Sequence, residues 1–440
     1  MKSANKVSIF LLCFLPVLSG LSQNNISDSY INIPIIDLSD ESFRQVIIDK
    51  EKFQYLGHPT TVLLEDKKTM LAIYPKGHGK GEIVFKKSTN GGRTWSDRIS
   101  VPESWKTSLE TPTIHRVIDG KGKKRLIVFS GLYPARMSYS EDDGKTWSEL
   151  EKVGDWGGVV VMSSLIPLKT GKGHYLAMFH DDLRFMTEDG KKEYSTDRKS
   201  NSQILFTLYK SFSYDGGLTW TKPEAILSRR DMNLCEPGVI RSPNGKQLAV
   251  LLRENARKYN SQIIFSDDEG KTWCEPRALP NELTGDRHVI RYAPDGRLLI
   301  VFRDISPQPF RNGLDKISRE KSNINFSELT KTSGIGSPTE GDWVGWIGTW
   351  SDLVNGTRGQ YRIRLKDNTR NWDCGYSGLE LLRDKSFIAT SYGSWETDQQ
   401  PYIICVRFKL KELDKKLKMS RGGRFKKSSP ATPYPQVASL

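Results

Sequence analysis

One eight-residue pattern, Ser-x-Asp-x-Gly-x-Thr-Trp, recurs four times and constrains the fold of this chain more than any other feature. The copies begin at Ser88, Ser140, Ser213 and Ser266, and the first has Asn90 in place of the Asp. In a tight turn, the Asp or Asn caps its own backbone, the Gly adopts a positive φ and the Trp packs on the adjacent sheet. Each copy therefore predicts a closed hairpin, and four copies predict a repeat protein.

Six segments follow the order apolar strand, polar turn, apolar strand, and they start near residues 60, 112, 163, 238, 289 and 378. A fifth, degraded copy of the eight-residue pattern, each copy of which is called a box below, ends at Trp372. PYIICVRFKL is expected as the outer strand of the last unit. Such units with variable loops are typical of a propeller. The sequence predicts an all-β fold, a single six-bladed β-propeller over residues 45–412. The irregular stretch 306–341 is expected as an insertion in the fifth blade and is a candidate lid.

The two ends of the chain are expected outside the propeller. Residues 1–22 begin with two lysines, continue with an apolar run too short to span a bilayer and end in small residues up to Ser22. This order is typical of a cleaved secretory signal peptide. Residues 23–44 are interpreted as an N-terminal extension and residues 413–440 as a basic, disordered tail. We expect an exported protein, periplasmic or extracellular, with no membrane span.

The net charge of +14 favours an anionic partner, but its location limits the choice. The segment from Arg407 to Lys427 supplies +8 of it. A nucleic-acid-binding protein is expected to carry a basic stripe on its folded body, so no nucleic-acid partner is predicted. Five cysteines are too few for a disulfide scaffold. Cys235 and Cys374 remain open between structural, free and oxidised states.

Counting back from the turns locates candidate site residues. In a propeller, equivalent positions of successive innermost strands form a ring at one end of the axis. Nine positions before the turn, four of the blades carry His58, Glu236, Arg287 and Tyr376. We expect these four side chains to lie in one ring. An imidazole, a carboxylate, a guanidinium and a phenol indicate a chemically active pocket.

The second strands return to the same rim and supply further candidates. These are Lys76, His78, His180, Asp181, Arg253 and Arg303. His288, which directly follows Arg287, is a further candidate. His78 lies between two glycines and has little packing role, which favours an acid/base or an anion-binding cation. The His180-Asp181 pair has no second histidine or cysteine cluster, so neither a metal nor a cofactor is expected. For each arginine, a salt bridge to a neighbouring blade remains an alternative.

Boxes of this kind on six blades resemble the sialidase (neuraminidase) superfamily, and they also resemble boxes of non-enzymatic receptor and matrix propellers. CEPGVIRSPNGKQLAVLLREN is similar to the segment that supplies a pocket glutamate and one arginine of the carboxylate-binding triad, which implies these roles for Glu236 and Arg253. GYSGLELLRDKSFIATSYG resembles the segment around the nucleophile, which implies that role for Tyr376. A neutral phenol can approach a 2-keto sugar acid whose carboxylate would repel an anionic nucleophile, and a neighbouring Glu can take its proton.

The sequence departs from the family at two positions. The arginine of the first strand is absent, and His58 is nearest to its place. The catalytic aspartate has no match in YPKGHGKGEIVF, where His78 is nearest. The third triad arginine is expected at Arg303, with Arg358 and Arg362 as alternatives.

The leading hypothesis is an exported, sialidase-like exo-glycosidase that releases a terminal acidic sugar, either sialic acid or a related ulosonic or uronic acid. Tyr376 is the expected nucleophile, Glu236 its activating base and His78 the acid/base. The residues expected to hold the sugar carboxylate are Arg253, Arg287 and Arg303. One alternative is a different acidic-glycan hydrolase or lyase that uses His and Asp chemistry, and another is a non-catalytic glycan- or protein-binding propeller. An acidic glycan is the expected partner, and we expect a monomer.

Overall fold

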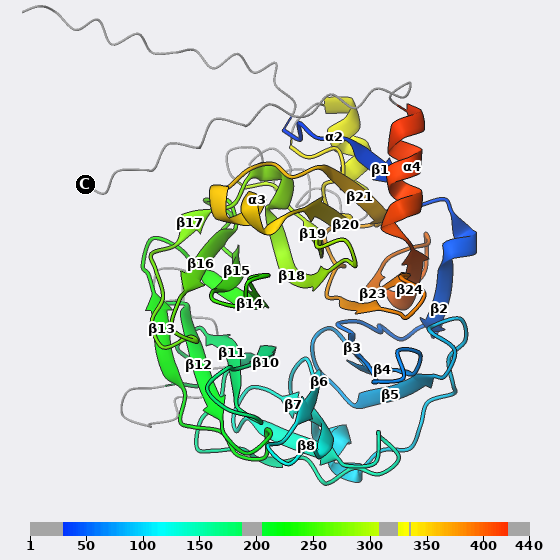
Figure 1. Cartoon of the computed structure of the whole chain (residues 1–440). Helices are drawn as coiled ribbons and strands as arrows, with labels where there is room; N and C mark the ends of the chain where they lie inside the picture. The colour runs from blue at the N-terminus through cyan, green and yellow to red at the C-terminus, as the bar shows by residue number, and fades with distance from the viewer. Residues whose placement is uncertain (1–29, 187–204, 308–323, 334–335, 421–440) are drawn as a thin grey trace, which may run out of the picture.

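Six sheets stand in a ring around a common axis (Figure 1). This computed structural model describes residues 30–186, 205–307, 324–333 and 336–420. The first strand of each sheet contacts the first strands of the two neighbouring sheets, so these strands surround the axis. The prediction of an all-β, six-bladed propeller is confirmed. The expected signal peptide lies outside the described residues.

The first three blades are antiparallel meanders in chain order. Blade one has three strands, β3 (Thr60–Leu63), β4 (Met70–Pro75) and β5 (Ile83–Ser88). Blade two contains β6 (Thr113–Ile118), β7 (Lys124–Ser130), β8 (Arg136–Ser140) and β9 (Glu151–Lys152). Blade three contains β10 (Val159–Pro167), β11 (Tyr175–Asp181), β12 (Thr207–Ser213) and β13 (Glu224–Ser228).

The next three blades keep this order, and blades five and six add strands from the N-terminal region. Blade four contains β14 (Leu234–Arg241), β15 (Leu248–Glu254), β16 (Gln262–Ser266) and β17 (Arg277–Ala278). Blade five contains β18 (Gly285–Tyr292), β19 (Leu298–Asp304), β20 (Trp343–Gly348) and β21 (Tyr361–Lys366), to which β1 (Ile35–Asp37) adds in parallel. Blade six contains β22 (Gly378–Leu381), β23 (Phe387–Gly393), β24 (Tyr402–Phe408) and β2 (Gln45–Asp49). The short helices between strands are η1 (Ser42–Arg44), η2 (Glu103–Thr107), η4 (Asn281–Leu283) and α3 (Trp350–Asn355).

The repeated boxes form the expected turns, as the second copy illustrates. Asp142 Oδ1 accepts the N–H groups of Lys145 (3.0 Å) and Thr146 (2.9 Å). Trp147, at the end of the box, packs edge-on against Phe85 of blade one, with ring centroids 5.7 Å apart. Because the tryptophan of one blade packs on the sheet before it, the box joins neighbouring blades as well as closing its own turn.

The ring is closed by the N-terminal strand β2, which pairs antiparallel with β24. The outer strand of blade six is therefore β2, and the prediction that PYIICVRFKL would be outermost is wrong. β24 is the third strand of the blade because it pairs with β23 on one edge and with the N-terminal strand β2 on the other. The expected extension 23–44 likewise contributes β1 to the sheet of blade five.

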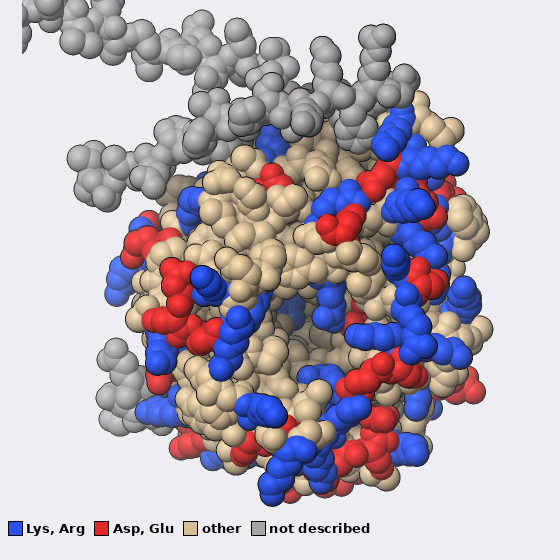
Figure 2. All heavy atoms as spheres, viewed as in Figure 1, with Lys and Arg blue, Asp and Glu red and all other residues tan. Residues whose placement is uncertain are grey.

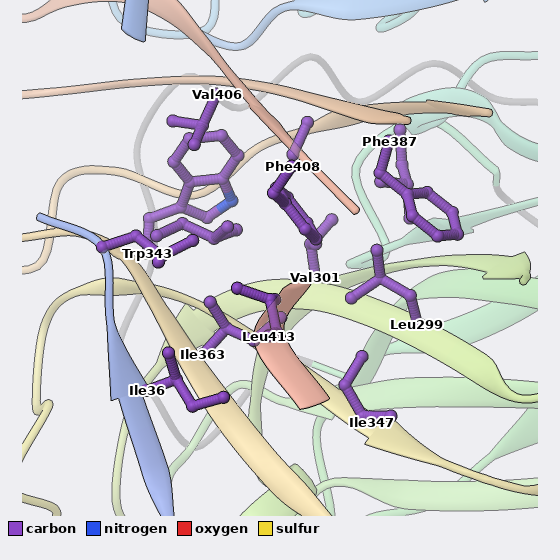
Figure 3. Close-up of a cluster of buried hydrophobic side chains, with 14 of the residues drawn as sticks. Ile36, Leu299, Val301, Trp343, Ile347, Ile363, Phe387, Val406, Phe408 and Leu413 are labelled. Atoms are coloured by element: carbon purple, nitrogen blue, oxygen red, sulfur yellow. The ribbon is translucent and has the colours of Figure 1, made fainter. Parts of the chain in front are cut away.

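Helix α4 (Leu410–Ser420) shows that the expected boundary at residue 412 is too early. Leu410, Leu413 and Leu417 are buried at helical spacing, and this apolar stripe packs the helix onto blades five and six. Figure 3 shows Leu413 among core side chains of β1, β19, β20, β21, β23 and β24. Residues 421–440 lie outside the described part of the chain.

The insertion in blade five contains helix α2 (Phe326–Ser333). Residues 308–323 and 334–335 lie outside the described part, so the candidate lid stays a prediction. Of the helices in the described ranges, none combines the length and the apolar character that crossing a bilayer requires.

We predict that Leu413→Ala lowers the free energy of unfolding by about 2–5 kcal/mol, because it leaves a cavity where α4 meets two blades. Chemical denaturation followed by tryptophan fluorescence measures the change. The matched control, Lys415→Ala, lies on the exposed face of α4 and should change the free energy by less than about 0.5 kcal/mol. Equal effects of the two substitutions would contradict the packing role of α4.

The face of the ring in Figure 2 is hollowed near the axis, and Lys and Arg side chains lie on the wall of the hollow. Around it, basic and acidic side chains are interspersed over the blades.

Candidate active site

A residue with left-handed backbone lies just before one inner strand, β3, and within three others, β10, β14 and β18. The φ angles are 54° at His58, 51° at Met162, 50° at Glu236 and 57° at Arg287. A side chain with a Cβ adopts this conformation at a cost, so its recurrence at equivalent positions indicates a local requirement. In β14 and β18 the pairing register shifts at this point, which marks a β-bulge. The bulge interrupts the alternation of side chains along the strand.

Tyr376 is the centre of the site and contacts the other three residues of the predicted ring. Its Oη donates a short hydrogen bond to Oε1 of Glu236. The imidazole of His58 lies against the phenol ring, with centroids 4.4 Å apart. The guanidinium of Arg287 lies 5.6 Å from the centroid of that ring. Burial and the adjacent Glu236 charge raise the pKa of Tyr376, so the phenol keeps its proton at rest.

Glu236 is held as a carboxylate by its neighbours. Arg253 donates from Nη1 to Oε1 at 2.9 Å, and the backbone N–H of Glu236 points to Nδ1 of His180 at 3.5 Å. Burial opposes ionisation, but the charge of Arg253 and the hydrogen bond from Tyr376 act against it, and the pKa of Glu236 is lowered to about 2. Burial lowers the pKa of His180 to about 4, so this imidazole is neutral when it accepts the bond. Glu236 is therefore a charged acceptor for the proton of Tyr376.

Two of the predicted arginines converge on one buried carboxylate. Arg303 donates to Oδ2 of Asp286 from Nε (2.9 Å) and Nη2 (2.5 Å), and Nε of Arg253 lies 3.3 Å from Oδ1. Arg257 completes the group with a bond from Nη2 to Oδ2 at 2.6 Å. Gly375 allows this close packing, because a Cβ there would lie 2.5 Å from Cβ of Arg303. Arg287 stands apart from the cluster and donates to the backbone carbonyl of Ser163 at 3.1 Å.

A chain of hydrogen bonds lines the other side of Tyr376. Nε2 of His78 lies 3.4 Å from Oδ1 of Asp373, which also accepts from Tyr392 Oη at 2.8 Å. Tyr392 Oη lies 3.3 Å from Nε2 of His58, and Nδ1 of His58 accepts the N–H of Gly79 at 3.2 Å. These bonds assign His58 as a neutral imidazole with its proton on Nε2. Burial agrees with this assignment, since it lowers the pKa of His58 to about 3.

His78 is the exposed member of this chain, with 67% of its side chain accessible, whereas Asp373 is 31% accessible. The hydrogen bond with Asp373 raises the pKa of His78. Burial opposes the ionisation of Asp373, but the charge and hydrogen bond of His78 and the hydrogen bond from Tyr392 act against it, and the pKa of Asp373 is lowered. The pair is therefore a carboxylate that stabilises a protonated, accessible imidazole at the edge of the site.

The remaining predicted residues have other surroundings. Lys76 lies 3.4 Å from Glu82 within its own loop. Asp181 accepts N–H groups of the loop after β11, and burial raises its pKa to about 6. His288 is buried, points its Nε2 at the carbonyl of Leu283 and stacks on Phe302, which is a packing role.

The alternative triad arginines also lie elsewhere. Arg362 forms a fully buried ion pair with Asp304 at 2.9 Å, and Arg358 lies 3.7 Å from Glu282. Cys235 and Cys374 are buried, free cysteines. In the described residues, no group of three or more His, Cys, Asp and Glu side chains is arranged to hold a metal ion.

Four residues of the site were missed by sequence reasoning, namely Asp286, Asp373, Arg257 and Glu110. Asp286 immediately precedes a ring residue, and Asp373 lies three positions before Tyr376, so proximity in sequence was an available signal. Glu110 is a buried carboxyl group whose Oε2 accepts the N–H of Val160 at 2.9 Å. Burial raises the pKa of Glu110, and the charges of Arg287 and Glu236 also act on it. No signal in the sequence indicated that Arg257 would contact Asp286.

Comparison with known proteins relates the fold to solved structures. A protein of unknown function from Dyadobacter fermentans matches with a TM-score of 0.57 at 14% identity, over 83% of this chain and 97% of that one. The NanB sialidase from Streptococcus pneumoniae matches with a TM-score of 0.52 at 10% identity, over 85% and 73% of the two chains. The Hadza microbial sialidase Hz136 matches with a TM-score of 0.50 at 16% identity, over 81% and 66%. The chain has a sialidase-like propeller fold. No family model matches this sialidase-like propeller.

Proposed function

We propose that this sialidase-like propeller is an exported retaining exo-glycosidase in which Tyr376 attacks the anomeric carbon. The observation that supports it most directly is the hydrogen bond from Tyr376 Oη to the carboxylate of Glu236, a residue of another blade. An activated nucleophile is recognised by such a contact between the attacking group and its base. The two sialidases of similar fold support a glycosidase on this scaffold.

In the first step, Tyr376 Oη bonds to the anomeric carbon while its proton passes to Glu236. The bond from that carbon to the leaving oxygen breaks, and protonated His78 gives its proton to this oxygen. In the second step, water attacks the same carbon and gives a proton to His78, and the bond to Tyr376 breaks. Tyr376 then recovers its proton from Glu236. Two displacements at one carbon retain its configuration.

The sequence predicts an acidic sugar on the expectation that three arginines are available to its carboxylate. Arg303 and Arg253 instead contact Asp286, and Arg287 lies against the ring of Tyr376. The proposal accordingly rests on the nucleophile, its base and the acid, and export rests on the signal-like pattern of residues 1–22.

Two measurements test the reaction. With a panel of aryl glycosides and the full chain, proton NMR of the first-formed product should show the anomer of the substrate. A 2-deoxy-2-fluoro glycoside with an activated leaving group should add one sugar to the peptide that contains Tyr376, as read by mass spectrometry. An inverted product, or an adduct on another residue, would overturn the proposal.

The role of His78 predicts a pH dependence. Only protonated His78 can donate, and its pKa is raised, so activity should be present below that pKa and lost as the pH rises through it. Asp373→Asn removes the hydrogen-bonded charge and should move this basic limb of the kcat/KM profile to lower pH. A basic limb that stays in place would contradict the assignment.

The same role can be tested through the leaving group. His78→Gln should slow release of a poor leaving group by about 100-fold or more, and should cost far less with a nitrophenol, which leaves without protonation. His174→Gln is the control, because His174 lies at a turn where it contacts Thr170. An equal loss with both leaving groups would contradict the acid role of His78.

A further inference from the structure

Asp286 is a carboxylate that the protein itself places inside its arginine cluster. Its Oδ2 accepts from Arg303 at 2.5 and 2.9 Å and from Arg257 at 2.6 Å, and Nε of Arg253 lies 3.3 Å from its Oδ1. The side chain is fully buried. Its pairing with three guanidinium groups satisfies both oxygens, as a bound carboxylate ligand would be satisfied.

The position of Asp286 is set by the backbone. It lies directly opposite Arg303 in the β18–β19 ladder, and the register shift begins just after it. The next residue, Arg287, adopts the left-handed conformation and reaches the ring of Tyr376. Of these two consecutive residues, Asp286 therefore places its carboxylate in the arginine cluster, and Arg287 places its guanidinium against the ring of Tyr376. Strand pairing fixes the backbone of Asp286, and ion pairs with Arg253, Arg257 and Arg303 hold its side chain in the cluster.

The surroundings of Asp286 favour its charged form. Burial alone would raise its pKa, but the charges of Arg253, Arg257 and Arg303 outweigh burial and hold the pKa far below its ordinary value. A second carboxylate entering this cluster would face Asp286 at close range, or would have to break its buried ion pairs. Both are costly where water is excluded.

We propose that Asp286 occupies the place of a substrate carboxylate, so that the site takes aldose glycosides, neutral or uronic, and rejects 2-keto sugar acids. This inference rests on the proposed glycosidase function. An aldose carries hydrogen, not a carboxylate, on its anomeric carbon, so nothing in the substrate needs Arg253 and Arg303. Their charges serve the protein by holding Glu236 and Asp286 in place.

The tyrosine nucleophile is consistent with this substrate class. Glu236 contacts Tyr376, and the charge of Asp286 also acts on Glu236. A carboxylate in place of the phenol would put a third negative charge beside these two. A neutral phenol avoids that repulsion whether the nearby carboxylate belongs to the substrate or to the protein.

The test compares substrate classes and needs no variant. The full chain is assayed with 4-nitrophenyl glycosides of neutral aldoses, of uronic acids and of N-acetylneuraminic acid. We expect kcat/KM for the best aldoside to exceed that for the sialoside by at least about 100-fold. A sialoside turned over as well as or better than every aldoside would overturn the inference and leave the proposed reaction standing.

A binding measurement decides the inference even if no glycoside is hydrolysed, in which case the proposed function fails separately. Titration calorimetry with free N-acetylneuraminic acid should give a Kd above about 10 mM for the native chain and binding tighter by about tenfold or more for Asp286→Asn. Asp342→Asn is the matched control, because Asp342 is a fully buried partner of Arg364. Millimolar or tighter binding by the native chain would overturn the inference.

Discussion

Tyr376→Phe is expected to lower kcat/KM by about 10⁴-fold or more, because it removes the hydroxyl oxygen that we propose bonds to the anomeric carbon. The ring survives the change, so its contacts with His58 and Arg287 are preserved. Steady-state assay with the best aryl glycoside of the panel gives the ratio. The covalent adduct trapped on the native chain should be absent from the variant.

The matched control is Tyr402→Phe. Tyr402 is also buried and also donates its hydroxyl to a glutamate, Glu396 at 2.7 Å, but it lies on β24. Turnover of this variant should stay within about twofold of the native value, whereas loss in both variants would point to a folding effect. If Tyr376→Phe kept the native rate of turnover, Tyr376 would be excluded as the nucleophile.

Glu236→Gln is expected to lower kcat/KM by about 10²- to 10⁴-fold, since the amide keeps the shape but cannot take the proton of Tyr376. The pKa of Glu236 is lowered to about 2, and a base is active above its pKa. The native profile should therefore show no acid limb from Glu236 above about pH 3. Rates measured from pH 3 to 9 check both statements.

Glu380→Gln is the control for this substitution. Glu380 is buried on the inner strand β22 and accepts from Arg291 at 2.8 Å, so it shares the burial and the ion pairing of Glu236 but has Thr61 as its other partner. Its activity should be close to native. A Glu236→Gln variant that keeps more than about a tenth of native activity would show that another group accepts the proton.

The blades were predictable because the residues that specify their turns and hairpins are close together in the sequence. A box such as the one beginning at Ser140 specifies its own turn, and the polar turns between apolar strands specify the hairpins. Closure by β2 was not predictable in this way, since its pairing with β24 joins residues at opposite ends of the chain. Helix α4 was missed because its lysines dominate the composition, although Leu410, Leu413 and Leu417 carry the helical period.

In the site, counting from the turns predicted that four side chains lie together, but it did not predict the partner of each side chain. Tyr376 does contact His58, Glu236 and Arg287. Counting could not predict which anion each arginine pairs with, because a guanidinium near the axis can pair with a substrate carboxylate or with a carboxylate of the protein. Only the register of β18 against β19 places Asp286 opposite Arg303.

Strand β2 is synthesised long before its partner β24. Until β24 is made, β2 has no partner strand, and an unpaired edge is open to pairing with other chains. Tyr376 precedes β22 of blade six, while His58 follows β2 and Glu236 belongs to β14. The proposed nucleophile, its proposed base and the flanking imidazole therefore come from segments far apart in the chain, so the proposed activity would report completed folding.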